Sequence, residues 1–188
     1  GYTQNVPGPA VLAGRVDASY PAWNVHVSDT QRATEFVRDY GALASEHRQP
    51  RFAYVTLPAG ADGPQGAAPQ AAVADGDRAL GTIVDFLSHL PSWRSTAVFV
   101  LPAGVRTGRD HIDASRTFAL VVSPYTKHGY IGMRHLSSAS VLKTVDRLFA
   151  LPALSLGDLL ANDMGDFFAT RPDLRPYTAA APRVLPSR

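Results

Sequence analysis

The sequence has no cysteine, no long apolar run and no cluster of basic residues. Without cysteine there can be no disulfides and no thiolate metal sites. The sequence therefore does not indicate whether the protein works in an oxidising or a reducing compartment. The apolar runs are much shorter than the roughly 20 residues that a membrane-spanning helix needs, so we expect no transmembrane segment. The formal net charge is only +2, and with lysine and arginine dispersed we expect no nucleic-acid partner.

Several catalytic motifs are also missing. The chain has no GxSxG nucleophile elbow, no HExxH zinc motif, and neither the GxGxxG nor the GxxxxGK[ST] phosphate loop. The glycines after residue 57 could cradle a phosphate, but their spacing favours an ordinary connecting loop. No complete catalytic or metal-binding constellation can be assembled from local motifs, and we expect no cofactor and no metal.

What the chain does have is a composition suited to a globular protein. Its 188 residues are 45% hydrophobic and 18% charged, which suits one domain with a sizeable core. We expect an extended N-terminal arm over residues 1–24, an α/β domain over 25–170 and a proline-rich C-terminal tail over 171–188. Because Gly1 stands at the start and no signal-peptide pattern follows, we expect a processed chain or a piece of a longer one.

Apolar periodicity predicts four helices and three strands. The helices are expected over residues 30–47, with Asp29 as N-cap, 70–90, 139–149, capped by Ser137 or Ser138, and 156–168. The strands are expected over 52–57, 96–101 and 118–122, with a short edge strand within 126–135. Because the three strands are continuously apolar and alternate with helices, the pattern predicts a mainly parallel sheet with helices on both faces.

A few polar residues could carry chemistry. Asp110, His111 and Asp113 lie close together in one loop, where they could bind a metal or could simply bond the backbone and Arg116. Two further groups have structural readings that we favour. Asp75 and Asp77 suit the positive dipole end of the long helix, and His128 and His135 are expected at the surface.

Three longer stretches resemble one family. They are VADGDRALGTIVDFLSHLPSWRSTAVFV, GRDHIDASRTFALVVSPYTKHGYI and SSASVLKTVDRLFALPALSLGDLLANDMGDFF. Their order and spacing resemble the C-terminal half of bacterial phosphoesterases of the alkaline phosphatase superfamily, the group of acid phosphatases and phospholipase C-like enzymes. The resemblance covers roughly residues 20–180 and implies a partial alkaline phosphatase-like fold in an exported, periplasmic or extracellular, protein.

The same resemblance implies a degenerate metal site. Where such enzymes carry a loop like LPNDHT, this chain has an LPAG loop with Ala59, Gly60 and Ala61. Where they carry a loop like EDDAQDGPDHVDAHR, a second LPAG loop places Pro102, Ala103 and Gly104 at the acidic positions and Ser115 at the final histidine. The matching positions that keep the family's residues are Asp110, His111, Asp113 and Arg116. Nothing in residues 1–24 resembles the half of the family that carries the nucleophile.

Three functional hypotheses follow. In the first, the chain is a catalytically inactive, truncated phosphoesterase-like domain in a larger assembly, with a protein partner or a second copy covering an exposed sheet edge. The second is a metal-dependent phosphoesterase completed by another chain, or using the reduced set Asp110, His111 and Asp113. The third is a module that binds phosphate esters without turnover.

Overall fold

The computed structural model describes residues 8–59, 69–102 and 116–180. The chain divides into two compact units. Unit 1 is Gly1–Leu90 together with Pro176–Arg188, and unit 2 is Pro91–Arg175.

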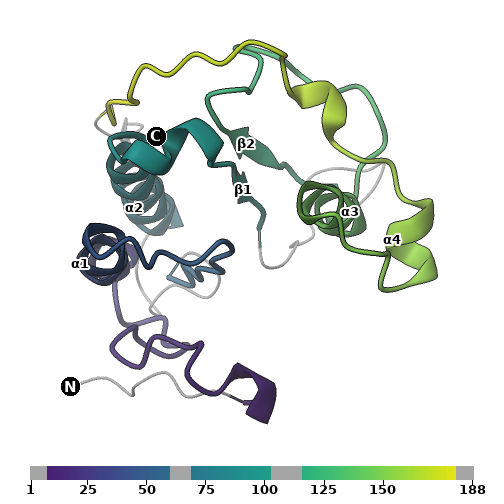
Figure 1. Ribbon diagram of the computed structural model, residues 1–188. Helices are drawn as coiled ribbons and strands as arrows, with labels where there is room; N and C mark the ends of the chain where they lie inside the picture. Colours follow the sequence, from purple (N-terminus) through teal and green to yellow (C-terminus); the bar gives the residue numbers. More distant parts are fainter. Residues whose placement is uncertain (1–7, 60–68, 103–115, 181–188) are drawn as a thin grey trace. The chain divides into compact units, whose positions relative to one another are not determined.

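Unit 1 is built on two helices that lie side by side (Figure 1). The helix α1 spans Asp29–Ser45 and α2 spans Pro69–Ser88, and a short 3-10 turn, η1, covers Ala10–Leu12. The two helices confirm the expectations for 30–47 and 70–90 to within a few residues. The predicted cap is wrong by one position, because the Oγ of Ser28 accepts the Gln31 N–H at 3.1 Å and Asp29 is the first helical residue.

The core of unit 1 lies between α1 and α2. Small and aromatic side chains of α1 face aliphatic side chains of α2; the buried ones are Ala33, Phe36, Ala79, Ile83, Val84 and Leu87. Tyr40 joins them, with its ring 5.1 Å from that of Phe36 and 6.3 Å, edge-on, from that of Phe86. The C-terminal segment is tied to α2, since the backbone N–H of Tyr177 donates to Ser88 Oγ at 2.9 Å.

The strand expected over 52–57 is absent. These residues are irregular, and Phe52 and Tyr54 are 60% and 81% exposed. A strand requires a neighbour to pair with its backbone, and here the Thr56 carbonyl instead accepts the hydroxyl of Tyr20 at 2.8 Å.

The described residues of unit 2 form a small sheet, two helices and two 3-10 turns. In chain order these are η2 (Pro91–Ser95), β1 (Val98–Val100), β2 (Leu120–Val122), α3 (Ser138–Phe149), α4 (Leu156–Leu160) and η3 (Gly165–Phe167). The strands are antiparallel, with Val98 opposite Val122 and Val100 opposite Leu120 (Figure 1). The two strands expected over 96–101 and 118–122 therefore exist in shortened form.

The predicted mainly parallel α/β sheet is wrong, and with it the alkaline phosphatase-like fold. Within the described residues the sheet has two strands, they run antiparallel, and most of the regular structure is helical. The error has a physical source. A continuous apolar run is typical of a strand that is buried on both faces. It does not specify the direction of that strand or the strands with which it pairs.

Helix ends in unit 2 are defined by short capping motifs. The expected helix 139–149 is confirmed as α3, where the Ser137 N–H donates to Ser140 Oγ at 3.1 Å. The expected helix 156–168 is too long, because α4 ends at Leu160 and the chain continues irregularly to η3. The edge strand within 126–135 is reduced, in the described residues, to a single bridge between Thr126 and Phe168.

Candidate functional site

The residues singled out by the resemblance fall only partly in the described structure. Ala59, Pro102 and Arg116 are described. The others lie outside the described residues: Gly60, Ala61, Ala103, Gly104, Asp110, His111, Asp113 and Ser115. Ala59 belongs to unit 1, whereas Pro102 and Arg116 belong to unit 2, where Arg116 is exposed. Whether Arg116 pairs with Asp110 or Asp113 stays a prediction.

Ala59 leads to the most polar part of unit 1. It is buried, and its backbone N–H donates to Oδ1 of Asp29 at 3.1 Å. A methyl side chain cannot coordinate a metal, so Ala59 contributes only its backbone here. Its partner Asp29 is the first residue of α1 and is 1% exposed.

We call the residues around the start of α1 the buried polar cluster: Asp29 and Arg32, which are buried, and Thr30 and Asp75, which are half-buried. Asp75, on α2, accepts the backbone N–H of Asp29 at 2.6 Å with one oxygen and the hydroxyl of Thr30 with the other. A carboxylate placed against the first N–H groups of a helix satisfies donors that have no partner inside the helix. Asp75 therefore caps α1, rather than the start of α2 as the sequence indicated.

Arg32 is the most buried member of the cluster, with an exposed fraction of 0%. Its guanidinium donates to the carbonyl oxygens of Pro21 at 2.5 Å, Ala22 at 2.8 Å and Asn24 at 3.0 Å. It also lies 5.6 Å from the ring centre of Tyr20. Arg32 thus holds the segment before α1 against the helix.

Burial controls the proton affinities in the cluster. Loss of water around Asp29 raises the pKa of its carboxyl, and the neighbouring Asp75 raises it further. The Ala59 N–H and the charge of Arg32 oppose that rise. Burial likewise raises the pKa of Tyr20 to about 12, which keeps its hydroxyl protonated as a donor to Thr56.

The chemistry open to this cluster is narrow. Two carboxylates are present, whereas a protein metal site takes three or four ligands. Among residues 8–59, 69–102 and 116–180, no three side chains of His, Cys, Asp or Glu gather closely enough to hold a metal ion. Both oxygens of Asp75 already accept hydrogen bonds from α1. The arrangement is that of a structural polar core.

The raised pKa of Asp29 gives a pH-dependent prediction. Because the folded state binds the Asp29 proton more tightly than the unfolded chain does, the ionised carboxylate destabilises the fold. That penalty is complete above the folded pKa and vanishes below the unfolded value. Asp29→Asn keeps an oxygen for the Ala59 N–H. It should therefore unfold at a higher denaturant concentration than the wild type at pH 7. The difference should shrink as the pH falls toward 4, because the wild-type carboxyl then takes up its proton.

Asp77→Asn, at an exposed position of α2, is the control and should match the wild type. If Asp29→Asn unfolded at a lower denaturant concentration than the wild type by the same amount at every pH, the destabilising role assigned to the ionised Asp29 carboxylate would be wrong.

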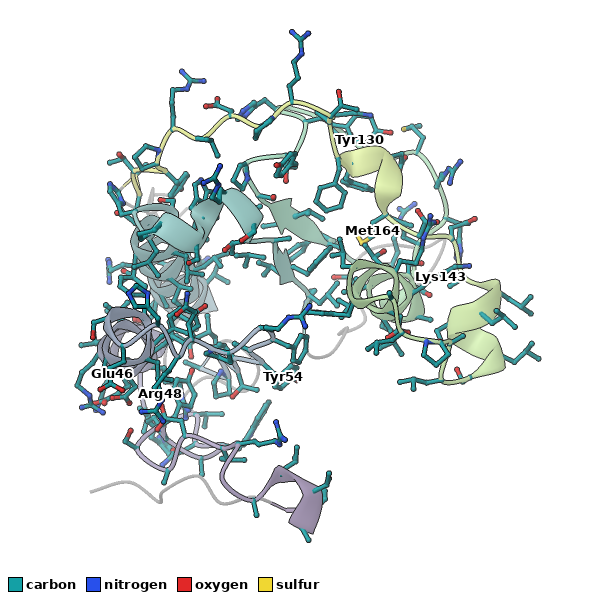
Figure 2. The ribbon with its side chains drawn as sticks, viewed as in Figure 1. Glu46, Arg48, Tyr54, Tyr130, Lys143 and Met164 are labelled. Carbon is teal, nitrogen blue, oxygen red and sulfur yellow. The ribbon has the colours of Figure 1, made fainter. Side chains whose placement is uncertain are left out.

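Unit 2 has the opposite character, with an exposed apolar surface. Among its described residues, Trp93 and Met164 are the only large apolar side chains that are buried. The buried positions of α3 are polar, namely Ser140, Thr144 and Asp146. Figure 2 shows Met164 beside α3, where its backbone N–H donates to Thr144 Oγ1 at 2.9 Å. The small apolar core is therefore supplemented by polar contacts.

Exposed apolar side chains extend along the rest of unit 2. The described ones are Leu101, Phe118, Leu120, Tyr130, Ile131, Met133, Leu142, Leu148, Leu151, Leu154, Leu156, Leu159, Leu160 and Leu174. Monomeric proteins rarely expose large contiguous apolar patches, and such patches mark sites of interaction. The histidine prediction is confirmed for His128, whose side chain is 81% exposed and 3.4 Å from Asp173.

Comparison with known proteins gives no family. No protein-family model matches the chain, and a search of the curated proteins finds no match. Within the described parts of the chain, no helix combines the length and the apolar character needed to cross a bilayer.

Proposed function

We propose that this chain is a non-catalytic subunit whose unit 2 binds another polypeptide through its exposed apolar side chains. The observation that carries the proposal is that unit 2 exposes many more large apolar side chains than it buries. Within its described part, only Trp93 and Met164 are large apolar residues that are buried. A folded unit must bury enough apolar surface to offset the loss of conformational entropy. A partner that covers the exposed side chains supplies the missing burial.

The sheet of unit 2 supports the same proposal. A two-stranded sheet is marginally stable by itself and gains stability from further strands or a covering helix. Natural sheet edges are normally protected by charged residues or proline, yet β1 and β2 consist only of valine, phenylalanine and leucine. Leu120 is 45% exposed, and Phe118 just before β2 is 58% exposed. These features favour a partner that adds an uncharged, extended apolar segment to the sheet.

The non-catalytic part of the proposal rests on the residues available for chemistry. In unit 1 the two carboxylates of the buried polar cluster are used as hydrogen-bond acceptors for backbone and hydroxyl groups. Ala59, Gly60 and Ala61, and Pro102, Ala103 and Gly104, have no side chain that can bind a divalent cation. Without a set of metal ligands or an activated nucleophile, nothing polarises the phosphate or attacks it, as phosphate-ester hydrolysis requires.

Hydrolysis is tested directly. The purified chain, incubated with an aryl phosphate and with Mg²⁺, Mn²⁺, Ca²⁺ or Zn²⁺ in turn, should release the aryl alcohol at the rate of buffer alone. Turnover that is lost in Asp110→Ala would overturn the non-catalytic assignment in favour of the reduced metal site.

Partner binding is tested by photocrosslinking in the cells that produce the protein. Phe118 is replaced by p-benzoylphenylalanine, and Phe52 of unit 1, which is 60% exposed against 58% for Phe118, gives the matched control. We expect a crosslinked adduct from position 118 and at least tenfold less from position 52. Mass spectrometry should locate the crosslink in an uncharged apolar segment. Equal yields at the two positions, or no adduct from 118, would contradict the proposal.

A further inference from the structure

One face of α2 carries a row of small and polar residues. Gly81, Asp85 and Ser88 are spaced i, i+4 and i+7 along this helix, and this spacing places them on one face. The buried core residues Ile83 and Leu87 lie on a different face of the same helix. We call Gly81, Asp85 and Ser88 the α2 track.

The C-terminal residues 176–180, which we call the strap, lie on this track. The hydroxyl oxygen of Ser88 accepts the backbone N–H of Tyr177 at 2.9 Å, and two residues further the backbone N–H of Ala179 donates to Asp85 Oδ2 at 3.0 Å. Donors two residues apart lie on the same edge of an extended chain. Figure 1 shows this yellow end of the chain beside α2. The strap is therefore held by side chains of the track through its backbone.

Gly81 leaves room for the strap. A Cβ added at position 81 would lie 3.2 Å from the Cβ of Ala179, which is tighter than an ordinary van der Waals contact. Glycine inside a helix is destabilising relative to alanine, because it loses more conformational freedom on folding. The close approach of the strap gives a structural reason for a glycine at this position.

The strap is attached at its backbone but buries little of its surface. Tyr177 is 43% exposed, Pro176, Thr178 and Ala180 are also exposed, and Ala179 is half-buried. None of these residues is among the buried apolar side chains of unit 1. Segments with few buried apolar contacts open at a lower free energy than the core of a domain. The strap can therefore leave the track at a lower cost than unfolding the two helices.

The strap also closes the chain around unit 2. Unit 2 is Pro91–Arg175, so the chain leaves unit 1 after Leu90 and returns to it at Pro176. Ser88 and Tyr177 stand next to these two connections, and the hydrogen bond between them holds both connections at one place on unit 1. When the strap is off the track, only the connection after Leu90 joins unit 2 to the helices of unit 1.

From these observations we propose that residues 176–180 are a releasable strap. In the closed state the strap lies on the α2 track and holds both connections of unit 2. In the open state the strap leaves the track while α1 and α2 stay folded, and unit 2 is joined to them by one connection. This inference goes beyond the proposed function and does not depend on it, because it concerns a contact within unit 1.

The experiment is native-state hydrogen exchange of the full chain, followed residue by residue by NMR. The amides of Tyr177 and Ala179 should exchange at least tenfold more slowly than in an unstructured peptide, because each donates to the track. They should exchange at least a hundredfold faster than the amides of Ile83 and Val84 in the middle of α2, because the strap opens without unfolding the helix.

Substitution of Asp85 tests whether the track holds the strap. Asp85→Leu removes the acceptor of the Ala179 N–H and should speed exchange of that amide at least fivefold. Asp85→Asn keeps an oxygen acceptor and should retain most of the protection. Asp77→Leu, at an exposed position of the same helix, is the matched control and should leave the Ala179 amide unchanged.

A disulfide can lock the strap, since the described chain has no cysteine of its own. The Cβ separation of 3.2 Å between positions 81 and 179 is close to the roughly 3.5–4.5 Å found in disulfides. Gly81→Cys combined with Ala179→Cys should form an intramolecular disulfide, and the Tyr177 amide should then exchange at least tenfold more slowly until the disulfide is reduced. Val73→Cys with Ala179→Cys is the control pair, because Val73 lies about 12 Å from Gly81 along the helix, and it should not form the disulfide.

Two results would overturn the releasable strap. If the strap amides of the wild type exchange as slowly as the centre of α2, the strap opens only when unit 1 unfolds. If they exchange as fast as in an unstructured peptide, the strap is not docked in solution. Neither result bears on the proposed function, which is read from the photocrosslink at position 118.

Discussion

Arg32→Leu should destabilise unit 1 strongly, by about 3–5 kcal/mol, because it breaks a buried network of hydrogen bonds. The leucine fills much of the same space but donates no hydrogen bonds. It leaves the buried carbonyl group of Pro21 and the half-buried carbonyl groups of Ala22 and Asn24 without their guanidinium donor. Each unsatisfied buried acceptor costs about 1–3 kcal/mol. A loss of this size is a large fraction of the roughly 5–15 kcal/mol that stabilises an ordinary domain.

The measurement is chemical denaturation followed by far-ultraviolet circular dichroism, which reports the helical content of the chain, most of it in α1 and α2 among the described helices. Arg38→Ala provides the control on the same helix. The Arg38 side chain is 57% exposed, and it pairs with Glu35 and Asp39 at the surface. That variant should unfold close to the wild-type midpoint, because exposed ion pairs add little stability. Equal midpoints for Arg32→Leu and the wild type would show that the segment before α1 is not held by Arg32.

Arg32 also shows what a sequence does not reveal. The apolar spacing of Ala33, Phe36 and Tyr40 predicts the helix and its inward face correctly. Nothing in that spacing distinguishes Arg32 from a solvent-exposed arginine, because its partners are backbone carbonyls that have no side-chain signature. A buried arginine of this kind is found only once the chain before α1 is placed.

The sheet illustrates a different limit. Apolar runs around Phe99 and Val121 correctly identify two strands, because continuous apolar residues are typical of strands that need cover. Direction and neighbours depend on contacts between distant parts of the chain, which periodicity does not encode. The run at 52–57 has the same apolar character but forms no strand, and Tyr54 within it is 81% exposed. The composition of these runs thus predicts that a segment can form a strand, but it does not predict which segment pairs with it.

The candidate site was predictable only in its residue types. Asp75 stands out in the sequence as a carboxylate near a helix start, and a structural role was favoured for it. The helix that it stabilises is α1 rather than its own, since α2 already begins at Pro69. A contact across 46 positions, from Asp75 to the N–H of Asp29, is set by helix packing and has no local signature.

Asp75→Ala should therefore weaken α1 without touching its sequence. We expect a loss of about 1–2 kcal/mol, the range found when a helix N-terminal cap is removed. The backbone N–H of Asp29 and the hydroxyl of Thr30 both lose their acceptor. Asp77→Ala, an exposed carboxylate on the same helix, removes a similar charge but no contact with α1. It should leave the denaturation midpoint nearly unchanged.

A double-mutant cycle with Thr30→Val distinguishes this cap from a general effect of charge. If Asp75 acts through the Thr30 hydroxyl, the double variant should lose less stability than the sum of the two single variants, because each substitution removes the same bond. Strict additivity would mean that the Thr30–Asp75 contact contributes nothing. Equal losses for Asp75→Ala and Asp77→Ala would assign the effect to net charge instead. The cap assignment requires both a coupling between Thr30 and Asp75 and a difference between the two aspartates, since a carboxylate that stabilises α1 must act through atoms that it touches.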